Sequence, residues 1–302
     1  MPLQNAPLRF SRLVRPSVFA IGLLAVLAAC DREHSTPTAA APPPPPVAQP
    51  APPPAAIELK DISESTPQYL IGVTYPPAAA KYPGLAKSLH DYTEAGRADL
   101  LKAVAGMKPG QSPGPYDLTL SYTLLAETPD VVAVAADGSS FTGGAHGTPL
   151  VARFVWLPQQ NAPMTGASLF SDPKAWTAVS DFAREQLHTQ LSQSIEEENL
   201  APAVRAQQLE MRNGMIDEGT GPKPESFALF EPVMTEAGKL RALRFVFAPG
   251  QVAAYVEGVR TVDVPTEVFQ SFLAPQYRDL FVVAPPPAPA APADAQAPQP
   301  AR

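Results

Sequence analysis

The residue whose setting most favours chemistry is His146, in the glycine-rich segment Thr142-Gly143-Gly144-Ala145-His146-Gly147. Glycines permit positive φ angles and close approach of other backbone, so a segment of this kind can shape a binding loop between two strands. An imidazole there could bind a ligand or act as a general base. A tight connection in which His146 bonds only to local backbone is the alternative. We therefore predict Thr142, Gly143, Gly144 and His146 as a possible ligand-binding loop and assign no catalytic residue.

Sequence signatures of the common enzyme classes are absent from the chain. It contains no GxSxG, HExxH, P-loop or GxGxxG motif, and no histidine pair or cysteine cluster spaced for zinc. The consecutive carboxylates of residues 196–198 point in different directions on a helix, which favours a solvated surface. The same holds for Asp217 and Glu218, expected in a loop over 213–221, and His90 and His188 are expected to be solvated. The sequence predicts a protein that is not an enzyme and holds neither metal nor cofactor.

A second reactive group is the thiol of Cys30, the single cysteine of the chain. Three arginines precede the apolar run 18–29, which has the length of a secretory signal and is short for a permanent membrane helix. The residues Leu27-Ala28-Ala29-Cys30 resemble the bacterial lipobox, which implies that the thiol receives a diacylglyceryl group and that the signal peptide is then cleaved off before Cys30. An ordinary signal peptide or an anchor helix are the alternatives. Residues 1–29 are thus predicted as a lipoprotein signal peptide, with the membrane as partner through Cys30.

The location and charge of the mature chain follow from this prediction. Asp31 resembles the sorting signal that keeps enteric lipoproteins in the inner membrane, which gives that membrane a slight preference over the outer one for an anchored domain facing the periplasm. Loss of three arginines from 22 basic residues leaves 19 against 29 acidic residues. This acidic balance disfavours nucleic acid as a partner and suits a cationic one.

Proline separates the chain into parts. Residues 36–56 contain ten of the 39 prolines and residues 284–302 contain seven, so neither segment can bury a core. We predict a lipidated, proline-rich tether over 30–56 and a disordered Pro/Ala tail over 284–302. The folded part between them would comprise an N-terminal α+β subdomain, residues 57–137, and a C-terminal α+β domain, residues 138–283.

Hydrophobic periodicity within 57–283 predicts the elements that position the glycine-rich loop. Apolar residues alternate strictly from 116 to 126, as in a half-buried strand, and recur at helical spacing over 84–106. The fold class is α+β, with mainly antiparallel sheets, one long helix and two or three shorter ones. Further strands are expected over 69–75, 131–136, 150–157, 227–230, 240–247, 251–256 and 261–264, and further helices over 172–195, 203–213 and 266–273.

Four segments together resemble a known family. They are residues 140–147 (SFTGGAHG), 165–170 (TGASLF), 247–258 (FAPGQVAAYVEG) and 262–265, in family order. They look like the extracytoplasmic module of RsiV-type anti-sigma factors and the N-terminal part of PdaC-type peptidoglycan deacetylases, domain-of-unknown-function family 3298. Residues 57–137, with 69–76 (YLIGVTYP), resemble its usual partner, family 4163. Ala254 and Val256 depart from the family's VAPYAxG, which puts the local backbone of that segment in doubt.

The resemblance implies a ligand-binding module in which Tyr255 and Gly258 join the glycine-rich loop. The anti-sigma members recognise lysozyme, but their cytoplasmic sigma-binding segment has no counterpart in residues 1–29, so we expect the module alone, mounted on lipid. The leading hypothesis is a lipid-anchored envelope module that binds a lysozyme-like muramidase or a peptidoglycan-related ligand. One alternative is a structural lipoprotein without a discrete ligand. The other is a hydrolase that uses His146, which requires a carboxylate within hydrogen-bond reach of the imidazole.

Overall fold

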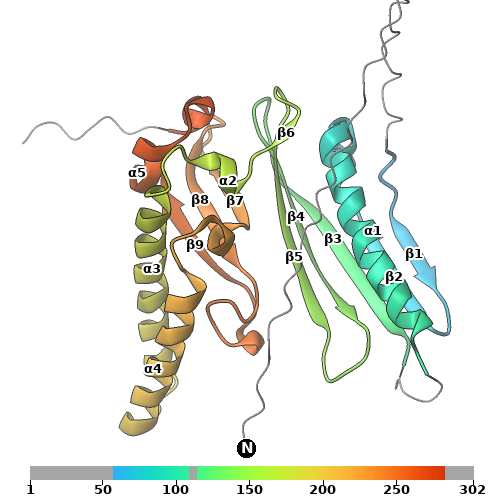
Figure 1. Cartoon of the computed structure of the whole chain (residues 1–302), viewed down its shortest axis with the longest axis horizontal. Helices are drawn as coiled ribbons and strands as arrows, with labels where there is room; N and C mark the ends of the chain where they lie inside the picture. The colour runs from blue at the N-terminus through green and yellow to red at the C-terminus, as the bar shows by residue number, and fades with distance from the viewer. Residues whose placement is uncertain (1–56, 109–113, 283–302) are drawn as a thin grey trace, which may run out of the picture. The chain divides into compact units, whose positions relative to one another are not determined.

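The computed structural model describes residues 57–108 and 114–282 (Figure 1). The predicted signal peptide, Cys30, Asp31, the tether and the tail lie outside the described residues, so these remain predictions. The described part is α+β, as the sequence predicts, and its strands form a six-stranded and a three-stranded sheet. Within this part of the chain, none of the helices combines the length and hydropathy that a membrane crossing needs.

The larger sheet places its six strands in chain order: β1 (Ile62–Ser65), β2 (Tyr69–Thr74), β3 (Tyr116–Glu127), β4 (Val132–Phe141), β5 (Thr148–Leu157) and β6 (Ala162–Pro163). Neighbours pair antiparallel, except for the parallel pair of β2 and β3. Parallel neighbours need a crossover connection, which the short 3-10 helix η1 (Pro77–Lys81) and helix α1 (Pro83–Ala105) supply. The alternation predicted for β3 is confirmed, because Leu118, Leu120 and Tyr122 are buried.

Helix α1 packs against one face of this sheet and is fixed there by a chain of hydroxyl groups. Leu85, Leu89 and Leu100 of the helix lie fully buried in the core that it shares with β2–β5. The Tyr75 hydroxyl donates to Thr93 Oγ1 at 2.7 Å, the Thr93 and Tyr122 oxygens are 2.8 Å apart, and Tyr122 donates to the Leu89 carbonyl at 3.0 Å. Burial raises the pKa of Tyr122, so its hydroxyl stays a donor.

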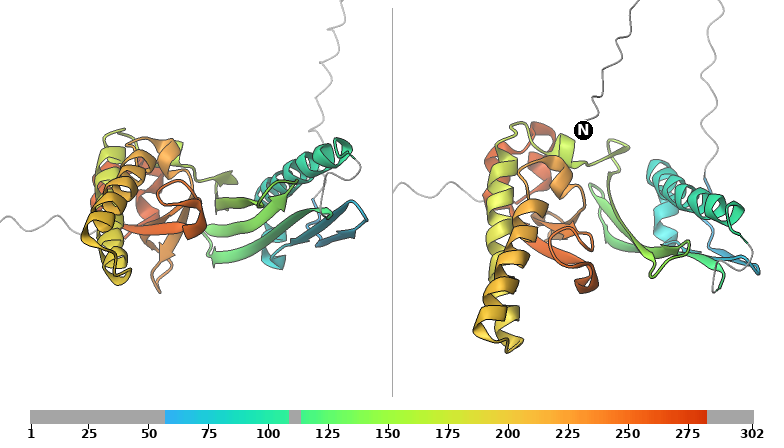
Figure 2. Two further views of the ribbon diagram at one scale, coloured as in Figure 1. Left: turned by 90° about the horizontal axis from the view of Figure 1, so that it is seen from below. Right: turned by 60° about the horizontal axis from the view of Figure 1, so that its bottom comes forward.

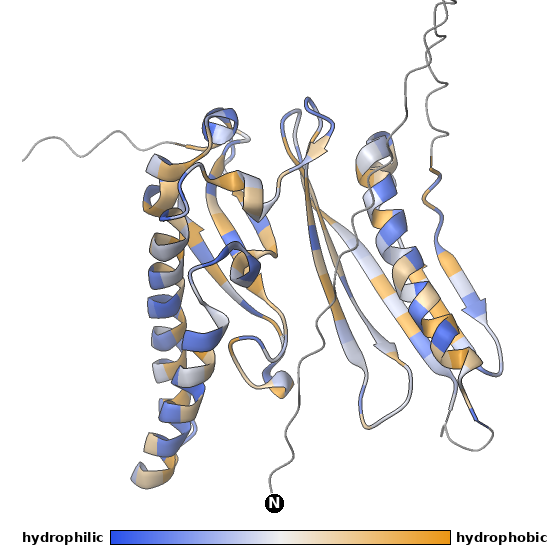
Figure 3. Ribbon diagram, in the orientation of Figure 1, coloured by the Kyte–Doolittle hydropathy of each residue, from blue (hydrophilic) through white to orange (hydrophobic). Residues whose placement is uncertain are grey.

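The smaller sheet has the antiparallel order β7 (Phe230–Met234), β8 (Leu240–Phe247) and β9 (Arg260–Pro265). Helix α3 (Ala175–Glu197) packs on it beside helix α4 (Pro202–Gly219), an arrangement visible in Figure 2. Hydrophilic and hydrophobic residues alternate along both helices (Figure 3). The helix predicted over 172–195 is confirmed as α3, with Trp176, Val179, Leu187, Leu191 and Ile195 buried. Shorter elements complete this part: α2 (Gly166–Leu169), η2 (Pro224–Phe227), η3 (Tyr255–Glu257), α5 (Thr266–Phe269), η4 (Gln270–Phe272) and η5 (Pro275–Leu280).

Strand β4 lies between two hydrophobic cores. Its first five residues are all buried. Val132 and Val134 belong to the core beneath α1, whereas Ala133 belongs to the core that β7–β9 and α3 build. The larger sheet is therefore covered on both faces at this point. The predicted division between residues 137 and 138 falls inside β4, so residues on both sides of it contribute to the same sheet.

The predicted end of the helix over 203–213 is wrong, because α4 continues to Gly219. A mid-helix glycine such as Gly214 costs about 1 kcal/mol relative to alanine, which tertiary contacts can offset. Here Ile216 is buried in the core, and the Thr220 hydroxyl donates to the Ile216 carbonyl at 2.7 Å. Asp217 and Glu218 consequently lie on a helix and not in the expected loop.

Two predicted strands are also wrong. Phe227, the first residue of the segment 227–230, is the last residue of the 3-10 helix η2, and strand pairing starts only at Phe230. The Phe227 side chain is buried, and its ring centroid lies 5.8 Å from that of Trp176. The segment 251–256 is a loop up to Ala254 and then enters the 3-10 helix η3. The Gln251 side chain fixes this loop by donating to the carbonyls of Gly219 and Ser226. Apolar composition in both segments reflects burial of single side chains and not a strand.

Two glycines of the larger sheet provide a test of its packing. A Cβ atom at Gly138 would lie 1.9 Å from the Thr119 carbonyl oxygen, whereas one at Gly72 would meet nothing within 4 Å. We expect Gly138→Ala to lower the free energy of unfolding by about 1–3 kcal/mol, the usual cost of overpacking. Gly72→Ala should leave it unchanged or raise it, because alanine restricts the unfolded chain. Urea denaturation of both variants measures this, and equal stabilities would contradict the strand register.

Candidate functional site

The glycine-rich loop 142–147 connects β4 to β5 directly after the pair Ser140 and Thr148. Gly143 and Gly144 have φ angles of 97° and 105°, which confirms the expected positive φ. A Cβ atom at Gly143 would also lie 3.2 Å from the Tyr116 hydroxyl. Glycine at this position therefore serves both the turn and the close packing of Tyr116. Thr142, Gly144 and His146 are exposed.

Tyr255, 108 residues further along the chain, meets this loop. Its hydroxyl donates to the Gly147 carbonyl at 2.6 Å, and its ring centroid lies 5.0 Å from that of His146 at an interplanar angle of 33°. Gly258, with a φ angle of 74°, ends η3 and turns the chain toward β9. Of the two residues that the resemblance adds to the loop, Tyr255 thus contacts it in space. Their binding of a ligand stays a proposal.

The surroundings of His146 do not resemble those of a general base. Its Nδ1 lies 3.4 Å from the carbonyl oxygen of Gly147, its own neighbour in the loop. Among residues 57–108 and 114–282, no carboxylate is hydrogen-bonded or ion-paired to the imidazole. The hydrolase alternative required such a partner. In this part of the chain its defining geometry is not found.

Apolar side chains are exposed beside the loop. Tyr255, Val256 and Val259 are 43%, 90% and 39% exposed, within five consecutive residues. The Val256 side chain, which is almost fully exposed, buries almost no apolar surface when the chain folds. Adjacent exposed apolar residues mark interaction surfaces more often than single ones do. We call residues 142–147 together with 255–259 the loop surface.

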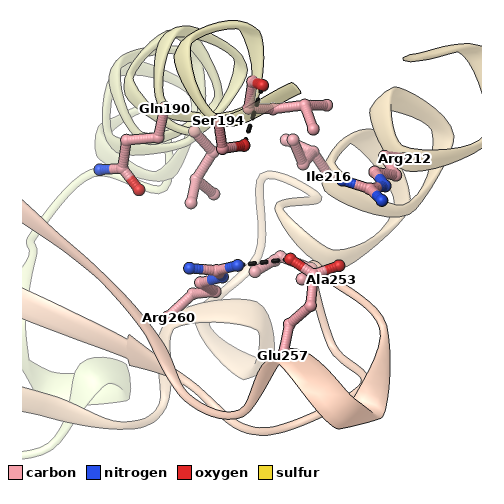
Figure 4. A pocket seen from close by; sticks show the side chains of 10 residues that line it. Gln190, Ser194, Arg212, Ile216, Ala253, Glu257 and Arg260 are labelled. Carbon is pink, nitrogen blue, oxygen red and sulfur yellow. Dashed lines mark hydrogen bonds and ion pairs between the residues drawn. The ribbon is translucent and has the colours of Figure 1, made fainter. Parts of the chain in front are cut away.

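The inner side of segment 252–260 lines a small cavity of about 60 Å³ against α3 and α4 (Figure 4). It is lined by both apolar and polar residues: Leu187, Gln190, Leu191, Ser194, Arg212, Ile216, Val252, Ala253, Glu257 and Arg260. No residue of the loop 142–147 is among these. This volume is well below the roughly 300–1,000 Å³ of small-molecule sites, so it suits one short side chain better than a cofactor.

Both guanidinium groups of this cavity are paired. Arg212 makes a two-pronged contact with Glu198, at 2.7 Å and 3.3 Å, and this carboxylate raises the pKa of Arg212. Arg260 pairs with Glu257. Glu198 lies at the end of α3 and Arg212 on α4, so this ion pair holds the two helices together at the cavity mouth. Sequence reasoning missed both arginines, because it placed Arg212 at the end of a helix over 203–213 and Arg260 between two expected strands, and neither position indicates a shared cavity.

His188 is not simply solvated as predicted. Its Nδ1 lies 2.5 Å from Asn213 Oδ1, and its Nε2 lies 3.1 Å from Asp217 Oδ1. Arg184 also pairs with Asp217. Because α4 runs past residue 213, these groups stand one turn apart on it and bond to α3. No group of three or more metal-ligating side chains occurs within the described ranges.

The Tyr255 contact can be tested by Tyr255→Phe. Loss of the hydrogen bond to Gly147 should lower the free energy of unfolding by about 1 kcal/mol or less, because the hydroxyl is partly exposed. The amides of the loop 142–147 should exchange hydrogen faster, since the loop opens locally. Hydrogen-exchange mass spectrometry of this segment measures the effect. Unchanged exchange would show that Tyr255 does not hold the loop.

Comparison with known proteins gives similar solved structures, among them two from one family. No protein-family model matches the chain, and no curated protein sequence matches it. A member of domain-of-unknown-function family 3298 from Bacteroides fragilis is similar with a TM-score of 0.46 and 15% identity, over 72% of this chain and 93% of that one. A protein of the same family from Pseudomonas aeruginosa is similar with a TM-score of 0.42 and 12% identity, over 74% and 96%. Both belong to the family that residues 140–147 and 247–265 resemble, while the likeness to family 4163 and to RsiV and PdaC stays a prediction.

Proposed function

We propose that this chain is a lipid-anchored binding module of the bacterial cell envelope that holds a lysozyme-like muramidase on its loop surface. The observation that carries the proposal is the exposure of Tyr255, Val256 and Val259 beside the glycine-rich loop. An exposed apolar surface suits a protein partner, which can cover it with a complementary surface of its own, better than a small molecule. Tyrosine and valine there would be covered on binding.

The charge of the folded part supports a basic partner. Residues 57–282 hold 26 acidic and 17 basic side chains. Muramidases of the lysozyme type are implied by the sequence resemblance, and a basic enzyme would be steered toward an acidic domain. Peptidoglycan itself is the second candidate ligand. The two differ in salt dependence, because electrostatic steering of a protein weakens as ionic strength rises.

Binding is tested with hen-type lysozyme and with purified sacculi as probes. We expect the full chain in non-ionic detergent to retain lysozyme, and the double variant Tyr255→Ala, Val256→Ser to bind it about tenfold more weakly or worse, since both side chains lie in the loop surface. The matched control is Val204→Ser with Met211→Ser, because these are exposed apolar residues on α4 that do not belong to the loop surface. Biolayer interferometry at two salt concentrations measures the affinities. Retention of neither probe, or equal loss in both double variants, would overturn the proposal.

Anchoring is tested separately by Cys30→Ser. Because a hydroxyl cannot form the thioether, we expect the variant to incorporate no labelled palmitate and to keep residues 1–29, since lipidation precedes cleavage. The measurement is metabolic labelling, with the mass of the protein determined in parallel. A serine variant that still incorporates palmitate at the level of the parent chain would contradict lipid anchoring at Cys30 without affecting the loop surface.

A further inference from the structure

Strand β5 has an open edge. On one side it pairs with β4 along its whole length, whereas on the other β6 covers only Trp156 and Leu157. The amide of Met164 also donates to the Val155 carbonyl at 2.8 Å, which extends the cover by one residue. The part of β5 before Val155 therefore has no strand beside it within the described residues.

The backbone groups on this edge can be assigned from the register. The Val155 carbonyl points away from β4, toward Met164. The pairing of β4 with β5 shows no register shift, and in a strand every second residue directs its N–H and C=O groups to the same side. Arg153 and Val151 therefore present their N–H and C=O groups to the open edge. Pro149 is next in the series and has no amide hydrogen. Prolines within sheets are usually found at edge positions of this kind.

A cavity of about 460 Å³ lies where the open part of this edge meets the part that Met164 and β6 cover. Four consecutive residues of β5, 153–156, line it, and only at an edge do both faces of a strand contribute to one cavity. Its walls are mostly apolar and come from α1, from the segment around β6 and α2, from η2 and from β7. The residues are Ser88, Pro163, Met164, Thr165, Gly166, Ala167, Pro224, Glu225, Ala228 and Phe230. The volume lies within the range of ligand sites, roughly 300–1,000 Å³.

The charges around the cavity are predominantly negative. The Arg153 side chain is 7% exposed, and it pairs with Glu231 at 2.5 Å and with Asp137 at 3.0 Å. One guanidinium thus faces two carboxylates that lie beside the cavity lining, and Glu225 is the carboxylate of the lining itself. A group that binds here beside its apolar part should therefore be neutral or positive.

We propose that the edge of β5 binds an extended peptide segment of a partner protein, which adds as a strand at Val151 and Arg153. An apolar side chain of the segment enters the cavity, and a flanking lysine or arginine faces the carboxylates of Asp137 and Glu231. Backbone groups at the edge recognise a peptide through its main chain, and alternate side chains give the selectivity. The proline-rich tether of this chain is a poor occupant, because residues 42–46 are five prolines without an amide hydrogen.

The test uses seven-residue peptides with lysine at alternate positions and leucine, valine, phenylalanine or tyrosine between them. Binding to the full chain in non-ionic detergent is followed by fluorescence anisotropy. We expect at least one peptide to bind, and its analogue with alternate amides N-methylated to bind about tenfold more weakly, as for the loss of one or two hydrogen bonds. An analogue with glutamate in place of lysine should also bind more weakly.

Three variants locate the site. Val151→Pro removes an edge N–H and leaves the pairing with β4 intact, so peptide binding should fall about tenfold. Val151→Thr is the matched control and should bind as the parent chain does. Ala228→Trp fills the cavity from an exposed position and should also abolish binding, which keeps the test decisive if the proline variant does not fold. Lysozyme retention by the loop surface should be unchanged in all three.

Other outcomes overturn the proposal. They are no binding by any peptide, equal binding of the N-methylated analogue, or equal binding by Val151→Pro and Ala228→Trp. Self-association of the chain that Val151→Pro abolishes, measured by sedimentation velocity in the absence of peptide, would identify a second copy as the occupant and would equally overturn it.

Discussion

The burial of β4 on both faces is the constraint on which the rest of the structure depends. A strand in a sheet with one solvated face alternates apolar and polar residues, but 132–136 must be apolar throughout because each face meets its own core. Small alanines at 133, 135 and 136 let other elements approach closely. Because the strand cannot shift by one residue without exchanging its two faces, its register is strongly specified. The positions of the loop at its end and of β5 beside it follow from that register.

The ion pair of Arg153 with Glu231 also fixes the position of β5. It links β5 of the larger sheet to β7 of the smaller one, and its side chains are only 7% and 15% exposed. Either charge left alone in that position would carry a large desolvation penalty, so separation of the two strands is strongly disfavoured. The hydroxyl chain of Tyr75, Thr93 and Tyr122 fixes α1 on the opposite face without any charge. Each face of the larger sheet is thus held by its own packing and its own polar contacts.

Periodic elements were predictable from the sequence, whereas irregular ones were not. The strands over 116–126 and 240–247 and the helix over 84–106 match β3, β8 and α1 closely, because their side-chain pattern alone carries the information. The end of α4 and the loop 251–256 depend on distant partners, such as Gly219 for the Gln251 side chain. Positive φ angles at Gly143 and Gly144 could be expected from residue type. The cavities could not, because each is assembled from segments far apart in sequence.

Pro149 affects whether two copies of the chain can pair through the open edge of β5. An uncovered strand edge can pair with the same edge of another copy of the chain. A neighbour that paired at Arg153 and Val151 would find no third donor at Pro149, so such a ladder would end after two residues. Pro149 therefore limits the edge-to-edge pairing from which fibres grow.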